Sequence, residues 1–176
     1  MKKLYFLLVT TVIPFLTFSQ NVKDTTDQRF HDDLLDHLVG RWNVTGVVYG
    51  TQAKLIFQAE WILNHQFLRV YEKSEGNIPG TNFPFETFLF IGYDNYTKRY
   101  IPQLVSMWGG TCSQNTTNAY RTGNEFKLVI IGPCVIGVER FTWEPASGSW
   151  HIESRELHEG KEGEPYLDLH GVAAGK

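Results

Sequence analysis

Hydrophobic and polar residues alternate with a period of two along most of the chain after Gly40. The alternation is clear at Trp42, Val44 and Val48, and it recurs in later segments separated by short runs of turn-forming residues. A period of two is typical of strands with one buried face. We predict strands at residues 41–48, 53–62, 66–74, 85–92, 98–107, 112–121, 125–131, 135–144, 149–158 and 165–171.

Helical spacing occurs once after the N-terminal segment. It predicts a short amphipathic helix that closes one end of the fold. About ten strands with short connections predict antiparallel neighbours, and closing them into a ring removes exposed edges. We therefore predict an all-β, up-and-down antiparallel barrel with one short helix before it, and residues 74–84 as its longest loop. The apolar face of the helix comprises Phe30, Leu34, Leu35 and Leu38.

The N-terminal segment has the pattern of a secretory signal peptide. Two lysines precede an apolar run from Leu4 to Phe18, which ends in small residues and is shorter than the roughly 20 residues of a membrane span. We predict a signal peptide at residues 1–20 and a single domain at residues 21–176, located in a periplasm or outside the cell. No membrane span is expected after cleavage.

Charge and motifs narrow the possible partners. The net charge is -3 and basic residues are scattered, which argues against nucleic acid and anionic membranes as partners. The chain lacks the Gly-x-Ser-x-Gly, His-Glu-x-x-His and phosphate-loop motifs. No cofactor is expected, and the oligomeric state is left open.

A Gly-x-Trp motif marks the start of the first predicted strand. Gly40-Arg41-Trp42 directly follows the predicted helix, and there the chain resembles the lipocalin and fatty-acid-binding superfamily. That resemblance implies a calycin-like barrel in which Trp42 plugs the closed end. A buried indole favours a stacked arginine, so we predict Arg155 or Arg69 packed across Trp42, with Gly40, Trp42 and Arg155 as the barrel plug.

Two further segments narrow the resemblance, which extends over residues 34–157. They are Glu60-Trp61-Ile62-Leu63 running into Gln66-Phe67-Leu68-Arg69, and Gly92-Tyr93-Asp94 followed by Lys98-Arg99-Tyr100. With them the chain is similar to the bacterial family called domain of unknown function 1579, a resemblance that implies a fold and no established activity. The chain departs from haem-binding nitrobindin-like barrels, because the second glycine pattern after the tryptophan is missing.

The two cysteines lie at equal distances from Gly123. If residues 122–124 form a three-residue hairpin loop, Cys112 and Cys134 stand opposite each other, and we predict a structural disulfide between them. In the same register Arg121 pairs with Glu125. The competing loop, Gly123 and Asn124 alone, turns Cys112 to the opposite face.

Candidates for polar chemistry occur near the C-terminus. His151, Glu153 and Arg155 alternate on one strand face, which is either a polar patch inside the barrel or a solvated outer face. Trp150 and Ile152 occupy the opposite face and favour the outer interpretation. His158 and His170 with Glu156 are possible metal ligands of suitable type. Surface histidines beside glutamates are far commoner, so no metal is expected.

Aromatic residues on several predicted strands line either a packed core or an apolar pocket. We predict that the barrel binds a small apolar or amphipathic molecule, and we favour binding over catalysis while leaving open whether the protein is an enzyme. Two other functions stay open: a hydrolase or isomerase using inward His or carboxylate groups, and a filled barrel with a role in envelope interactions. The predicted ligand-binding residues are Phe57, Trp61, Arg69, Tyr100, Phe141 and Trp143.

Overall fold

The structure is a computed structural model that describes residues 29–78 and 81–175. The predicted signal peptide at residues 1–20 lies outside the described residues. In the described part, no helix has the length and apolar character needed to cross a membrane. The elements are α1 (Asp33–Asp36), β1 (Gly40–Val48), β2 (Thr51–Ile62), β3 (Phe67–Asn77), β4 (Pro84–Asp94), β5 (Arg99–Ser106), β6 (Thr116–Thr122), β7 (Glu125–Ile131), β8 (Ile136–Glu144), β9 (Ser149–His158) and β10 (Lys161–Ala173).

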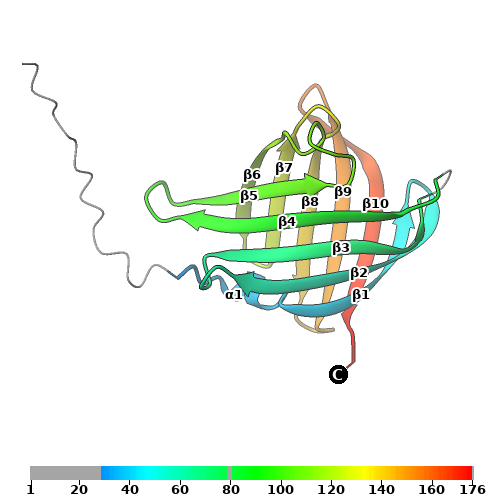
Figure 1. The fold of residues 1–176 in the computed structure, drawn as a ribbon. Coiled ribbons are helices and arrows are strands. Elements are labelled where there is room, and N and C mark those ends of the chain that lie inside the picture. The colour runs from blue at the N-terminus through cyan, green and yellow to red at the C-terminus, as the bar shows by residue number, and fades with distance from the viewer. Residues whose placement is uncertain (1–28, 79–80, 176) are drawn as a thin grey trace, which may run out of the picture.

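All ten strands form one closed antiparallel barrel, which confirms the predicted fold class. Each strand pairs with its sequence neighbours, and β10 closes the ring against β1. Figure 1 shows β2 to β5 running across the view in front of β6 to β9, which run steeply behind them. Because β3 and β4 extend further than predicted, the longest connection is residues 107–115 and not residues 74–84.

The helix α1 closes one end of the barrel, which we call the closed end. Asp32 caps α1 by accepting hydrogen bonds from the backbone N–H groups of Leu34 and Leu35. The apolar face of the helix is buried, and Trp42 beneath it is only 6% exposed. The Trp42 indole Nε1 donates to the Leu38 carbonyl at 2.8 Å. Trp42 is therefore buried in the closed end, as predicted.

The predicted arginine cover over Trp42 is wrong. Arg155 lies on the outer face of β9, where its guanidinium binds the Glu153 carboxylate and the Gly163 carbonyl. Arg69 lies on the outer face of β3, pairs with Glu60 and approaches the ring of Phe88. Strand alternation puts both arginines outside, and the space over the indole is occupied by α1 and the edge of Trp143.

The predicted register of the β6–β7 hairpin is also wrong. Arg121 pairs with Phe126 and Thr122 pairs with Glu125, so the loop consists of Gly123 and Asn124 alone. Two-residue loops are the commonest hairpin connections, since their twist fits that of the strands. Gly123 supports the turn with a φ of +58°.

The disulfide between Cys112 and Cys134 is present despite this register, with alpha carbons 5.1 Å apart. Strand pairing ends at Thr116 and Ile131, so both cysteines lie in the connecting segments beyond it. There the alternation of a strand no longer dictates where a side chain points. A bridge and a two-residue loop, which strand alternation predicts to exclude each other, therefore coexist.

The ring of strands has one weak seam, between β5 and β6. Their pairing consists of one residue pair, Tyr100 with Ala119, whereas β4 and β5 pair over the whole of β5. Pro102 in the middle of β5 has no backbone N–H to donate. Side chains replace part of the missing ladder, because the Asn115 amide donates to the Leu104 carbonyl at 3.0 Å.

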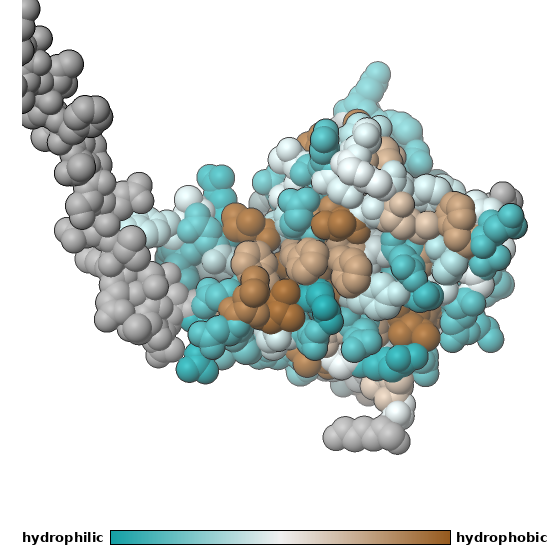
Figure 2. All heavy atoms as spheres, viewed as in Figure 1, coloured by the Kyte–Doolittle hydropathy of each residue, from teal (hydrophilic) through white to brown (hydrophobic). Residues whose placement is uncertain are grey.

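The outer face of β3 to β5 is unusually apolar. Figure 2 shows hydrophobic residues gathered on this side of the barrel. Ile101 and Val105 on β5 are 46% and 39% exposed, and Leu63 after β2 is 68% exposed. A shallow depression of about 260 Å³ beside them is lined by Ile62, Leu63, Phe67, Phe90 and Gln103.

Candidate functional site

The inward side chains divide the barrel into an apolar half and a polar layer. The half next to the closed end is tightly filled with apolar and aromatic residues. It comprises Trp42, Val44, Ala59, Leu68, Ile91, Phe126, Leu128, Phe141, Trp150 and Ile152. Further from α1, acidic and hydroxyl residues join the apolar ones at inward positions: Glu72, Thr87, Glu139 and Ser154.

Glu72 on β3 belongs to this polar layer. Its register neighbours are Phe57 on β2 and Thr87 on β4, and both are buried on the inward face. The Glu72 side chain is 7% exposed. Thr87 donates its hydroxyl proton to the Val105 carbonyl and not to Glu72. Among the described residues, Glu72 has no hydrogen-bond or ion-pair partner for its carboxyl group.

Glu139 on β8 is the second inward carboxyl group. Its register neighbours, Leu128 and Ser154, are 0% and 3% exposed, so Glu139 also points into the barrel. In the ring, four strands separate β3 from β8 in either direction, so Glu72 and Glu139 project from opposite walls. They are close enough for the charge of Glu139 to act on Glu72. No hydrogen bond or ion pair joins the Glu139 carboxyl group to another side chain in residues 29–78 and 81–175.

The oxygens of the two carboxyl groups are accessible to water. In the described part of the chain, Arg69 Nε is the one buried side-chain polar atom that has neither a hydrogen-bond partner nor access for water. The unpartnered oxygens of Glu72 and Glu139 must therefore face space that water enters. The Glu139 side chain is partly exposed although protein atoms surround it. Its exposed part therefore faces the interior of the barrel.

Burial raises the pKa of both carboxyl groups, because it removes water from the charged form. The pKa of Glu72 lies well above its usual range, first through burial and then through the negative charge of Glu139. Burial raises the pKa of Glu139 to about 7. The two groups titrate as a pair, so near neutral pH the interior holds a proton or an uncompensated negative charge.

Tyrosines border the polar layer on the side away from α1. Burial and the negative charge of Glu139 raise the pKa of Tyr166 on β10, and the hydroxyl of Ser154 opposes that shift. The ring of Tyr166 stacks on the ring of Tyr49 with centroids 4.9 Å apart. This end, which we call the open end, also contains the disulfide and the connection of residues 107–115.

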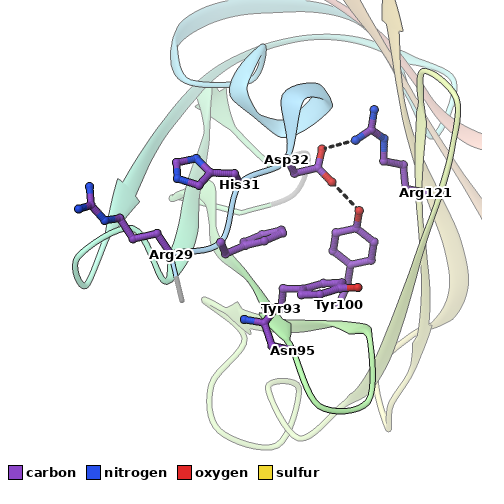
Figure 3. A pocket seen from close by; sticks show the side chains of 8 residues that line it. Arg29, His31, Asp32, Tyr93, Asn95, Tyr100 and Arg121 are labelled. Carbon is purple, nitrogen blue, oxygen red and sulfur yellow. Dashed lines mark hydrogen bonds and ion pairs between the residues drawn. The ribbon is translucent and has the colours of Figure 1, made fainter. Parts of the chain in front are cut away.

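A second hollow, of about 380 Å³, lies at the closed end and includes Asp32, Tyr100 and Arg121. Figure 3 shows Asp32 between the other two side chains, accepting a hydrogen bond from each. The pKa of Tyr100 is raised by burial and by Asp32, and the pKa of Arg121 is raised by its bond to Asp33. The carboxyl group of Asp32 is saturated by these bonds and the two helix-capping bonds. We interpret this cluster as a structural contact that holds the start of α1 against β5 and β6.

The structure disperses the six residues predicted to bind a ligand. Phe57 is the one that adjoins the polar layer, as the register neighbour of Glu72. Phe141 belongs to the packed core, and Arg69 lies outside the barrel. The remaining three gather at the closed end, where they pack around α1: Trp61, Tyr100 and Trp143.

The predicted outer patch on β9 is present. His151 and Glu153 face outward with Arg155, while Trp150 and Ile152 on the same strand are 1% exposed. His170 does not join His158, because its register partner across β9 and β10 is His151. His158 pairs instead with Glu156 on its own strand.

Sequence reasoning missed Glu72 and Glu139. A signal was present at Glu72, which continues the inward series Leu68 and Val70 on the predicted strand of residues 66–74. No family model and no curated protein matches this chain. The resemblance to the domain of unknown function 1579 family thus stays a prediction. A fold hosts many activities, so function must be argued from the site itself.

Proposed function

We propose that this barrel binds a small amphipathic molecule in its interior and holds a cationic group of that molecule, such as a protonated amine, between Glu72 and Glu139. The observation that carries the proposal is the pair of carboxyl groups that project inward from opposite walls of the barrel and have no hydrogen-bond or ion-pair partner among the described residues. Glu72 is buried and Glu139 is partly exposed.

The physical argument rests on the cost of burying charge. An ionised carboxylate without a partner is strongly disfavoured in a protein interior, and two facing carboxylates add mutual repulsion. A proton relieves this, as the raised pKa values of Glu72 and Glu139 indicate. A bound cation relieves it as well, and its attraction to both groups is strengthened by the low local dielectric.

The surroundings of the pair supply the apolar half of such a site. Phe57 flanks Glu72 on β2, and Leu104 on β5 is a partly buried member of the interior surface. Phe85 and Leu167 are partly buried towards the open end. Aromatic and aliphatic walls with a few convergent polar groups are the usual make-up of a small-molecule site. The apolar part of the ligand would contact these side chains.

We place this binding in an oxidising compartment, a periplasm or the cell exterior. The disulfide between Cys112 and Cys134 supports that location, since such bonds persist where thiols are not kept reduced. The predicted signal peptide at residues 1–20 is in keeping with it.

Acid–base catalysis is the second candidate function. A carboxyl group with a pKa of about 7, such as Glu139, is suited to exchange protons near neutral pH. A hydrolase or isomerase would show turnover that is lost in Glu139→Gln. Binding without turnover favours the first proposal.

A displacement assay tests the proposal. An apolar fluorophore bound to the purified protein is competed with an alkylamine, an alcohol and a carboxylic acid of equal chain length. The amine should bind at least about 10-fold more tightly than the alcohol, a difference of about 1.4 kcal/mol. Glu72→Gln and Glu139→Gln should remove this preference.

Glu75→Gln is the matched control, because Glu75 lies on the same strand with an exposed side chain. It should keep the preference for the amine. An absence of saturable uptake of any of the three compounds would favour a filled barrel with an interaction role. Equal affinity for the amine and the alcohol would refute the cationic site.

A further inference from the structure

We propose that the outer face of β9 and β10 holds a divalent transition-metal site, with His151, Asp168 and His170 as its three protein ligands. This site lies outside the barrel and is independent of the interior site. Two imidazoles and one carboxylate form a ligand set that suits Zn²⁺, with water in the remaining position. Copper and nickel ions accept the same donors.

Strand pairing brings the two histidines together. His151 and His170 are register partners across β9 and β10, so their side chains leave the same face at the same level. Their rings stack with centroids 4.6 Å apart and planes 9° from parallel. Asp168 precedes His170 by two positions and thus lies on the same face of β10. The platform is a paired region of the barrel wall, so the ligands do not depend on loop conformation.

The ligand atoms of the three residues are close enough together to bind one ion. One ligand atom from each of the three residues lies within 4.8 Å of the others. His151 Nε2 is 2.9 Å from Asp168 Oδ1, and His170 Nε2 is 3.9 Å from the same oxygen. Bonds of about 2.1 Å in tetrahedral geometry separate ligand atoms by about 3.4 Å. Small side-chain rotations would bring the observed distances to this value, and the partial exposure of the three side chains leaves room for such rotations.

The surroundings favour a cation. Glu144 lies near enough to both histidines for their charges to lower its pKa, after the larger effect of hydrogen bonds from Ser149 and Ser147. Glu153 is the register partner of Asp168. Glu153 is itself paired with Arg155 and Arg140, and Arg140 also binds Glu162. The acidic group that offsets the charge of a bound ion is therefore Glu144, which has no arginine or lysine partner among the described residues.

Calorimetric titration of the full protein, free of any histidine tag, with Zn²⁺ at pH 7.5 tests the site. We expect one ion per chain. His151→Gln and His170→Gln should each weaken binding at least about 10-fold, because even residues that only orient metal ligands typically change affinity by about 10- to 100-fold. With Cu²⁺, electron paramagnetic resonance should detect two coordinating nitrogens in the parent protein and one in His170→Gln.

Two controls separate this site from others. His158→Gln removes an exposed histidine from the same strand, and Glu72→Gln tests whether the ion binds to the interior carboxyl pair. Both should leave Zn²⁺ binding unchanged, and His170→Gln should leave the displacement of fluorophore by the alkylamine unchanged. Absence of Zn²⁺ binding would overturn the proposal. So would binding that survives both His151→Gln and His170→Gln, or binding lost equally in His158→Gln, while circular dichroism confirms that each variant is folded.

Discussion

The interior carboxyl pair makes stability fall as pH rises through neutrality. The pKa values of Glu72 and Glu139 are raised by folding, so the folded state binds more protons than the unfolded state as pH rises. Their favourable contribution to stability is complete below about pH 4.5, which is the ordinary pKa of a glutamate. It is lost as pH rises through about 7. The protein without ligand should thus be less stable at pH 8 than at pH 5.

Replacing one member of the pair should remove much of the loss of stability between pH 5 and pH 8. Glu139→Gln should raise the free energy of unfolding at pH 8 by about 1 to 3 kcal/mol and change it little at pH 5. Urea denaturation at the two pH values measures the difference, and Glu75→Gln serves as the exposed control. A variant that is destabilised equally at both pH values would show that Glu139 stabilises the fold and is not an unpaired buried acid.

Trp42 is the second residue whose contribution is measurable. It is 6% exposed, and its indole both packs against Trp143 and donates to the Leu38 carbonyl. Trp42→Ala should cost about 3 to 5 kcal/mol of unfolding free energy through the cavity that it leaves. Trp108, which is 50% exposed, gives the matched control Trp108→Ala. A denaturation midpoint that moves no further for Trp42→Ala than for this control would contradict the role of Trp42 as a plug.

At the residue scale the sequence predicted burial better than it predicted contacts. The positions of Trp42, Trp150 and Ile152 follow from alternation alone. The partner of a side chain depends on which strands close around it, so the arginine expected over Trp42 was placed wrongly. Glu72 and Glu139 lie far apart in sequence, and only closure of the barrel brings them to face each other.

The disulfide is an element that joins two loops at the open end. It connects residues 22 positions apart, and the chain-entropy estimate for a loop of that size is about 3 kcal/mol. A Cys112→Ser, Cys134→Ser double variant should lose about that much stability and keep its affinity for the alkylamine, because both cysteines lie in connections beyond the paired strands that carry Glu72 and Glu139. Thiol titration of the denatured, unreduced parent protein should detect no free cysteine. Two titratable thiols would contradict the bridge.

The seam between β5 and β6 should be the most mobile part of the wall. One residue pair joins the two strands, and Pro102 interrupts the donors of β5. Backbone amides of β5 and β6 that face the seam should exchange hydrogen faster than those of β8 and β9, as measured by mass spectrometry or NMR. Protection of the seam equal to that of β8 and β9 would mean that side-chain bonds such as Asn115 to Leu104 hold it closed.

At the element scale, the number and order of the strands were predictable because turn residues interrupt the alternation. Their limits were less so, since β6 begins at Thr116 and not at residue 112, and β10 spans Lys161–Ala173 and not residues 165–171. The hairpin register was not, since Gly123 fits both a two-residue and a three-residue loop. The equal spacing of the two cysteines from Gly123 favoured the three-residue loop, although the disulfide does not depend on that register. They lie beyond the last paired residues, where loop geometry and not strand alternation decides how they meet.

The barrel as a whole could be predicted because ten short antiparallel strands have few ways to avoid exposed edges. What it encloses could not be predicted, because inward charge is recognisable only when each strand face has been assigned. The whole molecule combines an apolar half beside α1 with an acidic layer towards the open end. That division is the basis of our proposal that the barrel binds an amphipathic cation.

The pH dependence of alkylamine affinity is the decisive measurement for a cation site between Glu72 and Glu139. A simple alkylamine, with a pKa near the roughly 10.4 of lysine, stays protonated between pH 5 and pH 8, whereas the carboxyl pair loses protons over that range. Affinity should therefore rise about 10-fold or more from pH 5 to pH 8 in the parent protein and stay flat in the Glu72→Gln, Glu139→Gln double variant. Affinity that is independent of pH in the parent, or that rises equally in the double variant, would contradict the proposed cation site between Glu72 and Glu139.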